Sequence, residues 1–535
     1  MADLLTRSEV VGSPIPDIPE RVLGDVLRRA VRLGATDPLI RTVSAHGEDS
    51  WTAEQLLHDT ERVAAGLMAR QSSGTRIATC LANGPEAILL QLGVALAGMV
   101  LVPINPRSSQ PELEHVLRLS GAAEIFAAQE VAGNPAADMA MDLVPVLPTL
   151  HHVHRCVGNW RELLGDSPAD LPAVDSASLA QIQFTSGTTG RAKGVEITHH
   201  GMVITSHAFR ERLGLPDGGV WVNPMPLFHT AGNVLGVFGA LWQRCEHVIL
   251  AFDSTRTLAL LAQHRATLLS AAPTLLDMLM VNTEMARADL SSLRVVFTGG
   301  QTVTPSFVAR VEERFGAPLS IAFGMTETCG AALQTAPSDP DDLRRTTVGR
   351  PLAGTDIRIA SPEGEPTALG QAGELWLRGS RLSTGYYQDP QATAAGIDDE
   401  GWLHTGDIAV MAPTGTCQIV GRLKDMIKSG GENVSPEEVE EVIVSHPSVA
   451  SAAVVGAPSE RWGELVVAFV VPTPGMTIDS TAVELHCRER LSTFKVPRIW
   501  RVVDALPMTA STKIQRHELR RIAAADPALQ TGTPQ

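Results

Sequence analysis

Aromatic residues are scarce in this sequence. They make up 4% of its 535 residues, and only two of them are Tyr. The interior must therefore be filled mainly by Leu, Val, Ile and Ala. Hydrophobic residues account for 44% of the chain and charged residues for 19%, as in ordinary globular proteins. A chain of this length is expected to form more than one domain.

The sequence also lacks an excess of positive charge. Its formal net charge is −16 at pH 7, which argues against nonspecific binding to nucleic acid or to an anionic membrane surface. The overall charge does not determine the potential inside a single cleft. A local basic pocket for a phosphorylated ligand is therefore still permitted.

The cysteines show no pairing pattern. Six are present, with neither a CxxC pair nor the spacing of metal ligands. We expect most of them to be buried small hydrophobic residues in a reducing, cytoplasmic setting. They are Cys80, Cys156, Cys245, Cys329, Cys417 and Cys487.

Neither a signal peptide nor a membrane span is predicted. The first residues contain acids and prolines where a signal peptide needs a basic and then an apolar run. The uncharged stretch Ala87–Ile104 approaches the length of a membrane span. However, Pro85 indicates a helix start, Gly98 a helix stop, and Met99–Ile104 a short buried strand. We therefore predict a helix followed by a core strand.

Two apolar runs in the middle of the chain, Leu293–Gly300 and Leu319–Gly324, are typical of buried strands that end in Gly. Between them, Pro305–Gly316 is typical of a helix with Pro at its start and Gly at its end. Apolar strands joined by a helix predict a parallel α/β sheet. Because ligands bind beyond the carboxyl ends of such strands, Thr298–Gly300 and Phe323–Thr326 are predicted pocket walls.

The pattern changes after about Thr347. Strands punctuated by Gly follow, and they predict an antiparallel or barrel-like part. A small final unit begins near Asp425, with a helix over Ser435–Pro447 that Ser435 caps. Further strands and a second helix complete this unit. The polar tail from about Ala524 is expected to be frayed.

The stretch TSGTTGRAKG, Thr185–Gly194, predicts a phosphate site. Gly lets the backbone approach a ligand and turn N–H groups toward it. Ser and Thr add hydroxyl donors, and Arg191 and Lys193 add positive charge. Together they form a cradle suited to a polyphosphate, although the spacing differs from that of the common nucleotide loop G-x-x-x-x-G-K-[ST]. The alternative is a flexible polar turn.

Six segments in a fixed order give this loop its context. TSGTTGRAKGVEITH resembles the phosphate-binding signature of the adenylate-forming superfamily, which includes acyl- and aryl-CoA synthetases, luciferases and the adenylation domains of peptide synthetases. The other segments resemble that family's acyl-site, adenine and metal, ribose, hinge and C-terminal lysine motifs. They are PLFHTAG (Pro226–Gly232), FGMTET (Phe323–Thr328), GWLHTGD (Gly401–Asp407), GRLKDMIKSGGENVSP (Gly421–Pro436) and PMTASTKIQR (Pro507–Arg516). The resemblance covers the chain from about Leu39 to Arg521.

The resemblance implies an α/β fold. A large N-terminal domain, residues 1–423, would hold two doubly wound sheets and a distorted β-barrel, and a small mobile α+β domain would span residues 424–535. The family joins a carboxylic acid to AMP and then transfers the acyl group to a thiol, usually that of CoA. The implied enzyme is an ATP-dependent ligase that forms a carbon–sulfur bond. Because the acid and ATP are both anions, positioning and charge neutralisation should dominate the first step.

The resemblance also implies a set of nucleotide-binding residues. Thr326 would reach the α-phosphate, and Glu327 would bind Mg²⁺, a hard cation that prefers carboxylate and phosphate oxygens. Asp407 would accept hydrogen bonds from the ribose hydroxyls; the alternative is a turn-forming Asp after Gly406. The β- and γ-phosphates would be held by Thr185, Ser186, Gly187, Thr188, Thr189, Gly190 and Lys193. The remaining nucleotide contacts are assigned to Gly300, Gln301, Thr302, Ala322, Phe323, Gly324, Met325 and Ile419, with the role of Gln301 left open.

Two lysines are assigned to the two half-reactions. Lys513 would bridge the carboxylate and the α-phosphate during adenylation, a task that suits a point charge on a flexible stem. Rotation of the small domain about Lys424, next to Arg422, would then bring the loop with Lys428 into its place. In that state the thiol arm would pass along Ser429, Gly430 and Gly431.

The acyl pocket is assigned from the same motifs. His229 is placed at its wall as a catalytic-site residue without a general-base role, because a lone His is more often structural. The other lining residues are Asn233, Val234, Thr298, Gly299, Gly324 and Cys329. Gly299, Gly300 and Ala322 leave room, which favours a bulky apolar acid over acetate. Amino acid substrates are disfavoured. The peptide-synthetase domains of this family usually carry an Asp after a Phe, which pairs with the substrate amine, whereas here Arg210 follows Phe209.

Three alternatives stay open. The family usually has Gly before the C-terminal lysine, and this chain has Thr512. If that position needs positive φ, a Cβ there costs about 1–2 kcal/mol, and the enzyme would only convert a preformed acyl-adenylate. A carrier-protein phosphopantetheine could replace CoA, whose 3′-phosphate would need Arg461 or Arg498. A noncatalytic nucleotide-binding regulator is the third alternative, against which Lys193, Glu327, Asp407 and Lys513 argue.

The implied partners are all small molecules: the carboxylic acid, ATP or AMP, and coenzyme A. The sequence is compatible with a homodimer.

Overall fold

The computed structural model describes residues 5–44, 47–165, 170–185, 192–429, 432–459, 462–508 and 514–525. The chain divides into two compact units. The larger unit comprises Val11–Ile357 and Leu377–Leu403; the smaller unit comprises Met1–Val10, Arg358–Trp376 and His404–Gln535. The family boundary expected between residues 423 and 424 stays a prediction.

A six-stranded sheet in the larger unit runs in the order β7-β6-β4-β5-β8-β9, and only β9 is antiparallel to its neighbour. Ile77 and Leu101 on one face pack with α1, α2 and α3, whereas Ala78 and Val102 on the other face pack with α4 and α5. The strands are β4 (Arg76–Cys80), β5 (Val100–Pro103), β6 (Glu124–Ala128), β7 (His152–Cys156), β8 (Leu179–Phe184) and β9 (Gly194–Thr198). The helices are α1 (Leu23–Gly34), α2 (Ala53–Met68), α3 (Pro85–Leu96), α4 (Gln110–Ser120) and α5 (Ala136–Leu143).

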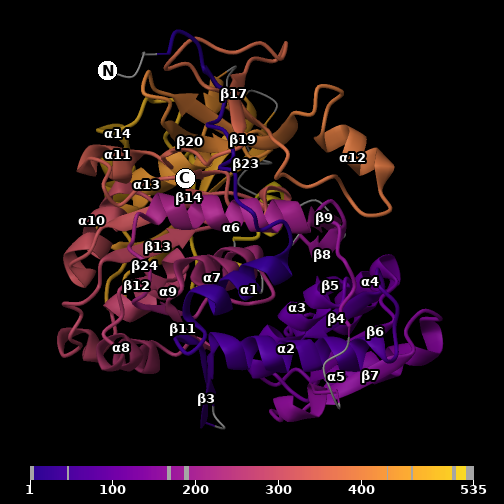
Figure 1. Cartoon of the computed structure of the whole chain (residues 1–535). Coiled ribbons are helices and arrows are strands. Elements are labelled where there is room, and N and C mark those ends of the chain that lie inside the picture. Colours follow the sequence, from indigo (N-terminus) through magenta and orange to yellow (C-terminus); the bar gives the residue numbers. More distant parts are fainter. Residues whose placement is uncertain are drawn as a thin grey trace. The chain divides into compact units, whose positions relative to one another are not determined.

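A nine-stranded sheet completes the larger unit, in the order β16-β15-β14-β13-β12-β10-β11-β2-β3, with parallel strands from β14 to β2. Val296 and Ile321 pack with α8, α9 and α10, and Val295 and Ala322 pack with α6 and α7 (Figure 1). The strands are β2 (Pro38–Ser44), β3 (Gly47–Thr52), β10 (Val220–Asn223), β11 (Glu246–Leu250), β12 (Leu268–Ser270), β13 (Val295–Gly299), β14 (Leu319–Phe323), β15 (Leu333–Gln334) and β16 (Arg350–Pro351). The helices are α6 (His199–Leu213), α7 (Gly239–Gln243), α8 (Ser254–Gln263), α9 (Pro273–Met280) and α10 (Pro305–Phe315). The predicted doubly wound architecture is confirmed.

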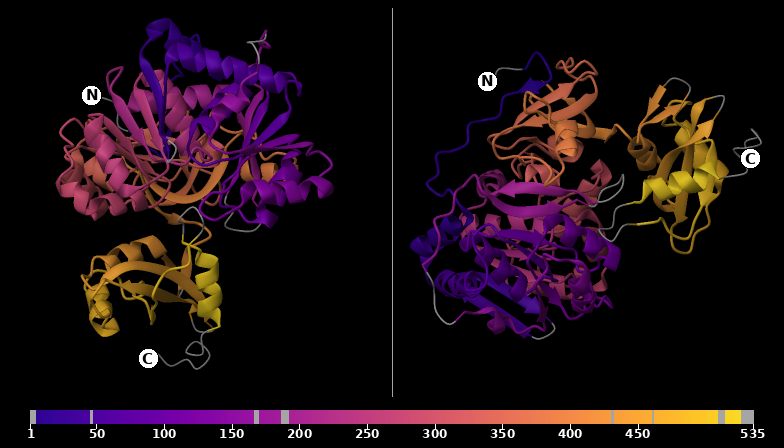
Figure 2. Two further views of the ribbon diagram at one scale, coloured as in Figure 1. Left: turned by 90° about the horizontal axis from the view of Figure 1, so that it is seen from below. Right: turned by 90° about the vertical axis from the view of Figure 1, so that its right-hand side faces the viewer.

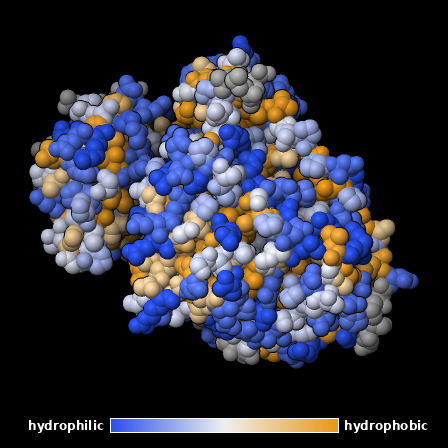
Figure 3. Space-filling model, turned by 60° about the vertical axis from the view of Figure 1, so that its left-hand side comes forward, coloured by the Kyte–Doolittle hydropathy of each residue, from blue (hydrophilic) through white to orange (hydrophobic). Residues whose placement is uncertain are grey.

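Local signals position the helices as expected. α10 begins at Pro305 after the cap Thr304, and Gly316 ends it in the left-handed conformation, with φ of 66°. α3 begins at Pro85, and the strand β5 follows it, as predicted for the uncharged stretch. No helix within the described ranges is long and apolar enough to cross a membrane. On the face shown in Figure 3, polar and hydrophobic residues are interspersed.

The smaller unit contains two sheets, of which the first includes a few strand-end residues of the larger unit. The first has the order β1-β17-β18-β19-β20, and β19 is antiparallel to β20. The second, β22-β21-β24-β23 with β25 beside β24, carries α13, α14 and α15, drawn in orange to yellow in Figure 2. The strands are β1 (Glu9–Val10), β17 (Asp356–Ala360), β18 (Gly373–Arg378), β19 (Leu403–Met411), β20 (Cys417–Arg422), β21 (Ile427–Ser429), β22 (Glu432–Val434), β23 (Val449–Ser459), β24 (Gly463–Pro472) and β25 (Ile499–Val502). The helices are α13 (Pro436–Val444), α14 (Ser480–Arg488) and α15 (Arg516–Ala524).

A buried carboxylate stabilises the six-stranded sheet. Glu124 on β6 is fully buried and accepts hydrogen bonds from Arg70, Gln71 and the ring of His154, at 2.8–3.3 Å. Burial alone would raise the pKa of Glu124, but these bonds outweigh it and lower that pKa to about 2. The carboxylate therefore stays ionised at all ordinary pH values.

We expect Glu124→Gln to lower the free energy of unfolding at pH 7 by about 2–3 kcal/mol, because charge-assisted hydrogen bonds are lost. A lowered folded-state pKa contributes stability that is present above the unfolded value, 4.5, and is lost as the pH falls toward 2. The difference in free energy of unfolding between the unaltered protein and Glu124→Gln should therefore shrink as the pH falls from 4.5 toward 2. Urea titrations at several pH values measure it, and equal midpoints at pH 7 would contradict the assignment.

Candidate functional site

The ends of the predicted phosphate loop meet at the β8–β9 hairpin. The backbone N–H of Thr185 donates to the carbonyl of Lys193 at 3.0 Å, directly after the antiparallel pair Phe184–Gly194. Ser186, Gly187, Thr188, Thr189 and Gly190 lie outside the described residues. The described part of the loop therefore consists of its two anchored ends.

Glu327 lies in a short 3-10 turn, Thr326–Thr328, that follows β14. It is 5% exposed, so it is not an exposed loop acid. The hydroxyl of Tyr386 donates a hydrogen bond to its Oε1 at 2.7 Å. Burial raises the pKa of Tyr386, and the charge of Glu327 raises it further, so the hydroxyl stays protonated and remains a donor.

Tyr386 also connects this acid to the phosphate loop. The Nζ atom of Lys193 lies 4.8 Å from the centre of the Tyr386 ring, in a cation–π contact. One side chain thus contacts both Lys193 and Glu327. Sequence reasoning missed Tyr386, although it is one of only two Tyr in the chain.

The donor set fits Mg²⁺ bound together with a nucleotide rather than a preformed metal centre. Within the described ranges, no group of three His, Cys, Asp or Glu side chains could hold a metal ion. Mg²⁺ is usually held by one or two carboxylates together with substrate phosphates. The single carboxylate of Glu327 matches that pattern, so the remaining ligands would be phosphate oxygens and water.

The ends of β13 and β14 bring most of the predicted nucleotide residues together. Thr298 and Gly299 lie opposite Ile321 and Ala322 in parallel register. Gln301 and Thr302 follow β13, and Phe323, Gly324, Met325 and Thr326 follow or end β14. The topology therefore gathers these segments at one edge of the sheet, as predicted for carboxyl ends of parallel strands.

The glycines do not all leave room for a substrate. A Cβ on Gly299 would lie 2.5 Å from the carbonyl oxygen of Ala322, and one on Gly324 would lie 2.3 Å from that of Gly330. These positions permit close approach of backbone to backbone. The expectation that Gly299 provides space for a bulky acid is therefore wrong, whereas Gly300, with φ of 79°, has no described atom within 4 Å of an added Cβ.

The predicted acyl-site motif leads into a π-helix over Ala231–Phe238, a form that is frequent at functional sites. His229 precedes it, and its backbone N–H donates to the carbonyl of Pro226 at 3.1 Å. Asn233 and Val234 are fully buried in this helix. Asn233 Oδ1 and Thr298 Oγ1 are buried without a hydrogen-bond partner in the described chain.

Cys329 is fully buried, and its thiol donates to the carbonyl of Arg381 at 3.3 Å. Burial raises its pKa to about 12, so it remains a thiol. Its φ of 56° is unusual for a residue with a side chain. Cys329 therefore shapes a strained turn after Glu327.

In the smaller unit, Asp407 lies within β19 rather than in a turn. It is 3% exposed, and its Oδ1 pairs with Nε of Arg422 on β20 at 2.8 Å. Burial raises the pKa of Asp407, and the charge of Arg422 opposes that shift. Gly406 precedes it with φ of 69°, and its N–H donates to Glu374 at 2.9 Å. Ile419 lies on β20 opposite Ala409.

The predicted hinge is followed by β21, which carries Lys428 and the buried Ser429. The side chain of Lys428 is exposed, and its backbone N–H donates to Glu464 at 2.7 Å. Burial lowers the pKa of Lys424. Gly430, Gly431 and Lys513 lie outside the described residues.

The helix after the predicted lysine motif is anchored by charge. Arg516 on α15 pairs with Glu437 at 3.2 Å and with Glu440, both on α13, and Arg520 pairs with Asp425 at 2.6 Å. Sequence reasoning did not predict this cluster, because its members come from segments far apart in the chain.

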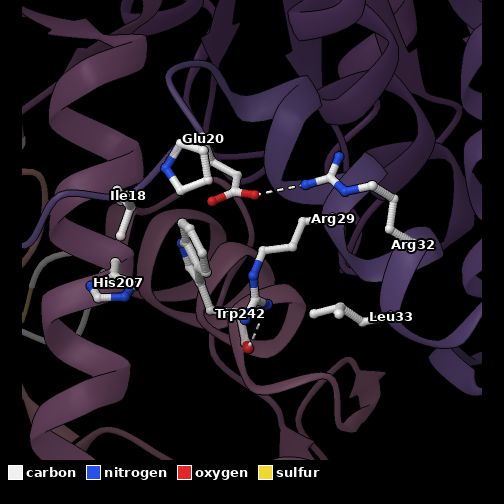
Figure 4. Close-up of a pocket in the computed structure, with 8 residues that line it drawn as sticks. Ile18, Glu20, Arg29, Arg32, Leu33, His207 and Trp242 are labelled. Atoms are coloured by element: carbon white, nitrogen blue, oxygen red, sulfur yellow. Dashed lines mark hydrogen bonds and ion pairs between the residues drawn. The ribbon is translucent and has the colours of Figure 1, made fainter.

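Two surface pockets of the larger unit are lined by none of the site residues that the sequence predicted. One, of about 380 Å³, adjoins Tyr386 and is lined by Glu196, Thr384, Gly385, Tyr386, Gln388, Asp389, Pro390, Thr393 and Ala394. The other, of about 410 Å³, lies between α1, α6 and α7 and contains no predicted site residue (Figure 4). There Arg32 already pairs with Glu20 at 2.8 Å, and Arg29 lies over the Trp242 ring.

Known sequences resemble this chain over most of its length. The sequence model of the AMP-binding enzyme family matches residues 29–387, and that of the AMP-binding enzyme C-terminal domain matches residues 438–513. A 3-[(3aS,4S,7aS)-7a-methyl-1,5-dioxo-octahydro-1H-inden-4-yl]propanoyl:CoA ligase of Mycobacterium tuberculosis is 35% identical, over 91% of this chain and 98% of its own. A feruloyl-CoA synthase of an Amycolatopsis species is 34% identical, over 90% of this chain and 95% of its own.

Solved structures show the same fold. ATP-bound MatB from Rhodopseudomonas palustris superposes with a TM-score of 0.86 at 26% identity, covering 94% of this chain and 99% of its own. The o-succinylbenzoate CoA synthetase of Bacillus subtilis, in complex with its acyl-adenylate intermediate, gives 0.82 at 25% identity, covering 96% and 99%.

The chain belongs to the AMP-binding enzyme family. It is a ligase of the acyl-CoA synthetase kind, which forms carbon–sulfur bonds.

We expect Tyr386→Phe to raise the Mg²⁺ concentration needed for half-maximal ATP binding by about tenfold, because a hydrogen bond to a charged acceptor contributes about 1.5–3 kcal/mol. The phenyl ring still permits the contact with Lys193. Calorimetric titration of ATP at several Mg²⁺ concentrations measures the effect. Tyr387→Phe is the matched control, and equal Mg²⁺ dependence in both variants would show that Tyr386 does not orient Glu327.

Proposed function

We propose that this enzyme activates a carboxylic acid with ATP as an acyl-adenylate and then transfers the acyl group to the thiol of CoA. The observation that supports this most strongly is the pair of contacts made by Tyr386. The ring of Tyr386 contacts Lys193, a cation of the phosphate loop, and its hydroxyl donates a hydrogen bond to Glu327, a buried acid. A triphosphate that binds between loop and acid would find both a cation and a metal-binding carboxylate.

In the first step, a carboxylate oxygen of the acid attacks the α-phosphorus of ATP. The bond to the β-phosphate oxygen breaks, and pyrophosphate leaves. Two anions must approach each other, so the chain has to supply positive charge and hydrogen-bond donors at the reacting oxygens. Lys193 and the hydroxyls of the loop would hold the pyrophosphate part, Thr326 would contact the α-phosphate, and Lys513 would bridge the two reactants.

Glu327 would hold Mg²⁺ together with the phosphate oxygens. When bound, this ion neutralises part of the triphosphate charge. Because Glu327 is nearly buried and receives the Tyr386 hydroxyl on Oε1, its carboxylate has a fixed orientation before any ligand arrives. That preorganisation removes a reorientation cost from nucleotide binding.

Asp407 would accept hydrogen bonds from the ribose hydroxyls, as acids do at other nucleotide sites. It must be ionised for this purpose, although its burial disfavours the charged form. The ion pair with Arg422 offsets that cost. The strand pairing of β19 and β20 places both residues opposite each other.

In the second step, the CoA sulfur attacks the acyl carbon and AMP leaves with its phosphate oxygen. Rotation about Lys424 would exchange the segment of Lys513 for that of Lys428, so that one acyl site serves both half-reactions. The cytoplasmic setting proposed for this chemistry agrees with six cysteines that are all free.

The proposed acid is bulky and mainly apolar. The two curated relatives described above carry names of ring-containing acids. The buried π-helix with Val234 would supply an apolar wall. The unpartnered oxygens of Asn233 and Thr298 would accept a hydrogen bond from a hydroxyl group on such an acid. Comparing matched acids with and without a ring, and with and without a hydroxyl, tests this substrate class.

Substitution of either charged phosphate-site residue should separate the half-reactions. We expect Lys193→Gln and Glu327→Gln to lower pyrophosphate release with acid and ATP by about 10²–10³-fold, because charge stabilisation is lost where two anions react. Thioester formation from synthetic acyl-AMP and CoA should stay within about threefold. Coupled pyrophosphate detection and thioester chromatography measure the two steps.

The same assay decides between the proposed function and its rivals. If the unaltered enzyme releases no pyrophosphate with any acid but converts acyl-AMP, it belongs to the non-adenylating kind. If acyl-AMP accumulates and only a phosphopantetheinylated carrier protein accepts the acyl group, CoA is not the acceptor.

The pH dependence of ATP binding tests the role of Asp407. Arg422→Gln removes a charge that lowers the pKa of Asp407, so that pKa should rise further. We expect the loss of ATP affinity on the acidic side to begin at higher pH than in the unaltered enzyme. Calorimetric ATP affinity between pH 5 and 8 measures this shift. Arg488→Gln, which breaks an ordinary surface ion pair with Glu484, should leave the profile unchanged; an unshifted profile in Arg422→Gln would contradict the assignment.

A further inference from the structure

Arg381 is an unusual charged residue in the larger unit. Its side chain is completely buried, with 0% exposure. None of the described carboxylates forms an ion pair with it. Buried charges are normally paired with an opposite charge, because desolvation is costly. Burial lowers the pKa of Arg381 to about 10, so it is still a cation at neutral pH. A buried, unneutralised guanidinium requires a specific reason.

The hydrogen bonds of Arg381 indicate that reason. Its Nε donates to Oγ1 of Thr355 at 2.7 Å, and its Nη1 donates to Oγ1 of Thr205 on α6 at 3.0 Å. The same Nη1 donates to the carbonyl of Ala331 at 2.8 Å and contacts that of Thr328 at 3.5 Å. The last two acceptors belong to the turn that follows Glu327.

These two carbonyls lie on either side of a strained turn. Between them stand Cys329, with φ of 56°, and Gly330, with φ of 104°. Consecutive left-handed residues are unfavourable when one of them has a side chain, and they persist only when the surroundings fix them. The planar, forked guanidinium group can donate to several acceptors at fixed angles. Arg381 therefore stabilises this turn by contacting a carbonyl on each side of it.

The segment around Arg381 is fastened to the same turn at further points. The backbone N–H of Ser383 donates to the carbonyl of Glu327 at 2.8 Å. The hydroxyl of Tyr386 donates to the Glu327 carboxylate, and the thiol of Cys329 donates to the carbonyl of Arg381. Residues 381–386 therefore brace the turn from Glu327 to Ala331.

The turn also reaches the predicted acyl site. A Cβ on Gly330 would lie 3.1 Å from Oγ1 of Thr230 and 3.3 Å from Cγ of Leu235, which precede and belong to the π-helix. One end of the turn thus carries the metal-binding candidate, and the other end packs against the acyl-site helix. A shift of the turn would move both.

We propose that Arg381 is a positioning residue, which fixes the Glu327–Ala331 turn so that the Mg²⁺-binding carboxylate and the wall of the acyl pocket keep their places together. This inference rests on the proposed roles of Glu327 and of the acyl site. Arg381 touches neither substrate nor metal; it acts through the two carbonyls that it holds.

The test compares Arg381→Lys, which keeps the charge but not the fork, with Arg381→Gln, which loses both. Arg378→Gln is the matched control, because Arg378 pairs with Asp356 at 3.1 Å and stacks on Trp402. Calorimetry gives the ATP dissociation constant with and without Mg²⁺. Pyrophosphate release gives kcat and the KM for the acid, and thermal melting gives the folded fraction.

We expect Arg381→Gln to raise both the half-saturating Mg²⁺ concentration and the KM for the acid by about tenfold or more, with little change in the affinity for metal-free ATP. Arg381→Lys should restore part of each loss. Thr205→Val removes one anchor while retaining Arg381, so it remains informative if an Arg381 variant does not fold. It should shift both quantities in the same direction by a smaller factor.

The inference is overturned if folded Arg381→Lys and Thr205→Val retain the Mg²⁺ and acid dependence of the unaltered enzyme, or if activity falls only with the folded fraction. It is also overturned if Arg378→Gln gives the same pattern. Failure of the proposed function looks different: the unaltered enzyme would release no pyrophosphate. In that case, the Mg²⁺ dependence of ATP binding in the Arg381 variants would still test the positioning role of Arg381 without the activity assay.

Discussion

The hydrogen bond from the Tyr386 hydroxyl to the Glu327 carboxylate is the contact on which the candidate site depends. It joins two segments that are 59 residues apart in the chain, and the face of the same ring lies beneath Lys193. A buried carboxylate needs hydrogen-bond donors to remain ionised and oriented. Tyr386 supplies one without adding a charge of its own. The Tyr386 side chain therefore contacts both the acid proposed to bind a cation and the lysine proposed to bind phosphate.

Two charged side chains of the larger unit, Glu327 and Arg381, have neutral hydrogen-bond partners. The Glu327 carboxylate accepts a hydrogen bond from the Tyr386 hydroxyl, and Arg381 donates to hydroxyls and carbonyls. By contrast, the buried carboxylate of Glu124 is paired with the opposite charge of Arg70. Asp407 lies between these cases, because its partner Arg422 is partly exposed.

Much of the fold was predictable because its signals are local. Pro305 and Gly316 delimit α10, Pro85 starts α3, and the apolar runs around them form the parallel strands β13, β14 and β5. The motifs predicted the family, and sequence comparison confirms it. The interpretation of Gly299 as pocket space failed, because the carbonyl that fills this space belongs to the neighbouring strand. A glycine alone does not reveal whether a ligand or a backbone approaches it.

The sequence by itself determined the class of enzyme, several of its strands and helices, and the identity of the acid, lysine and ribose candidates, since each depends on a short run of residues. Only the tertiary structure decided that Tyr386 donates a hydrogen bond to Glu327 and that Asp407 pairs with Arg422 on the neighbouring strand. It also decided that Arg381 binds the turn after Glu327 without a carboxylate partner among the described residues. These contacts join distant segments. Hydrogen bonds and ion pairs depend on separations of about 3 Å, and such separations are set by the packing of sheets and helices rather than by neighbouring residues in the chain.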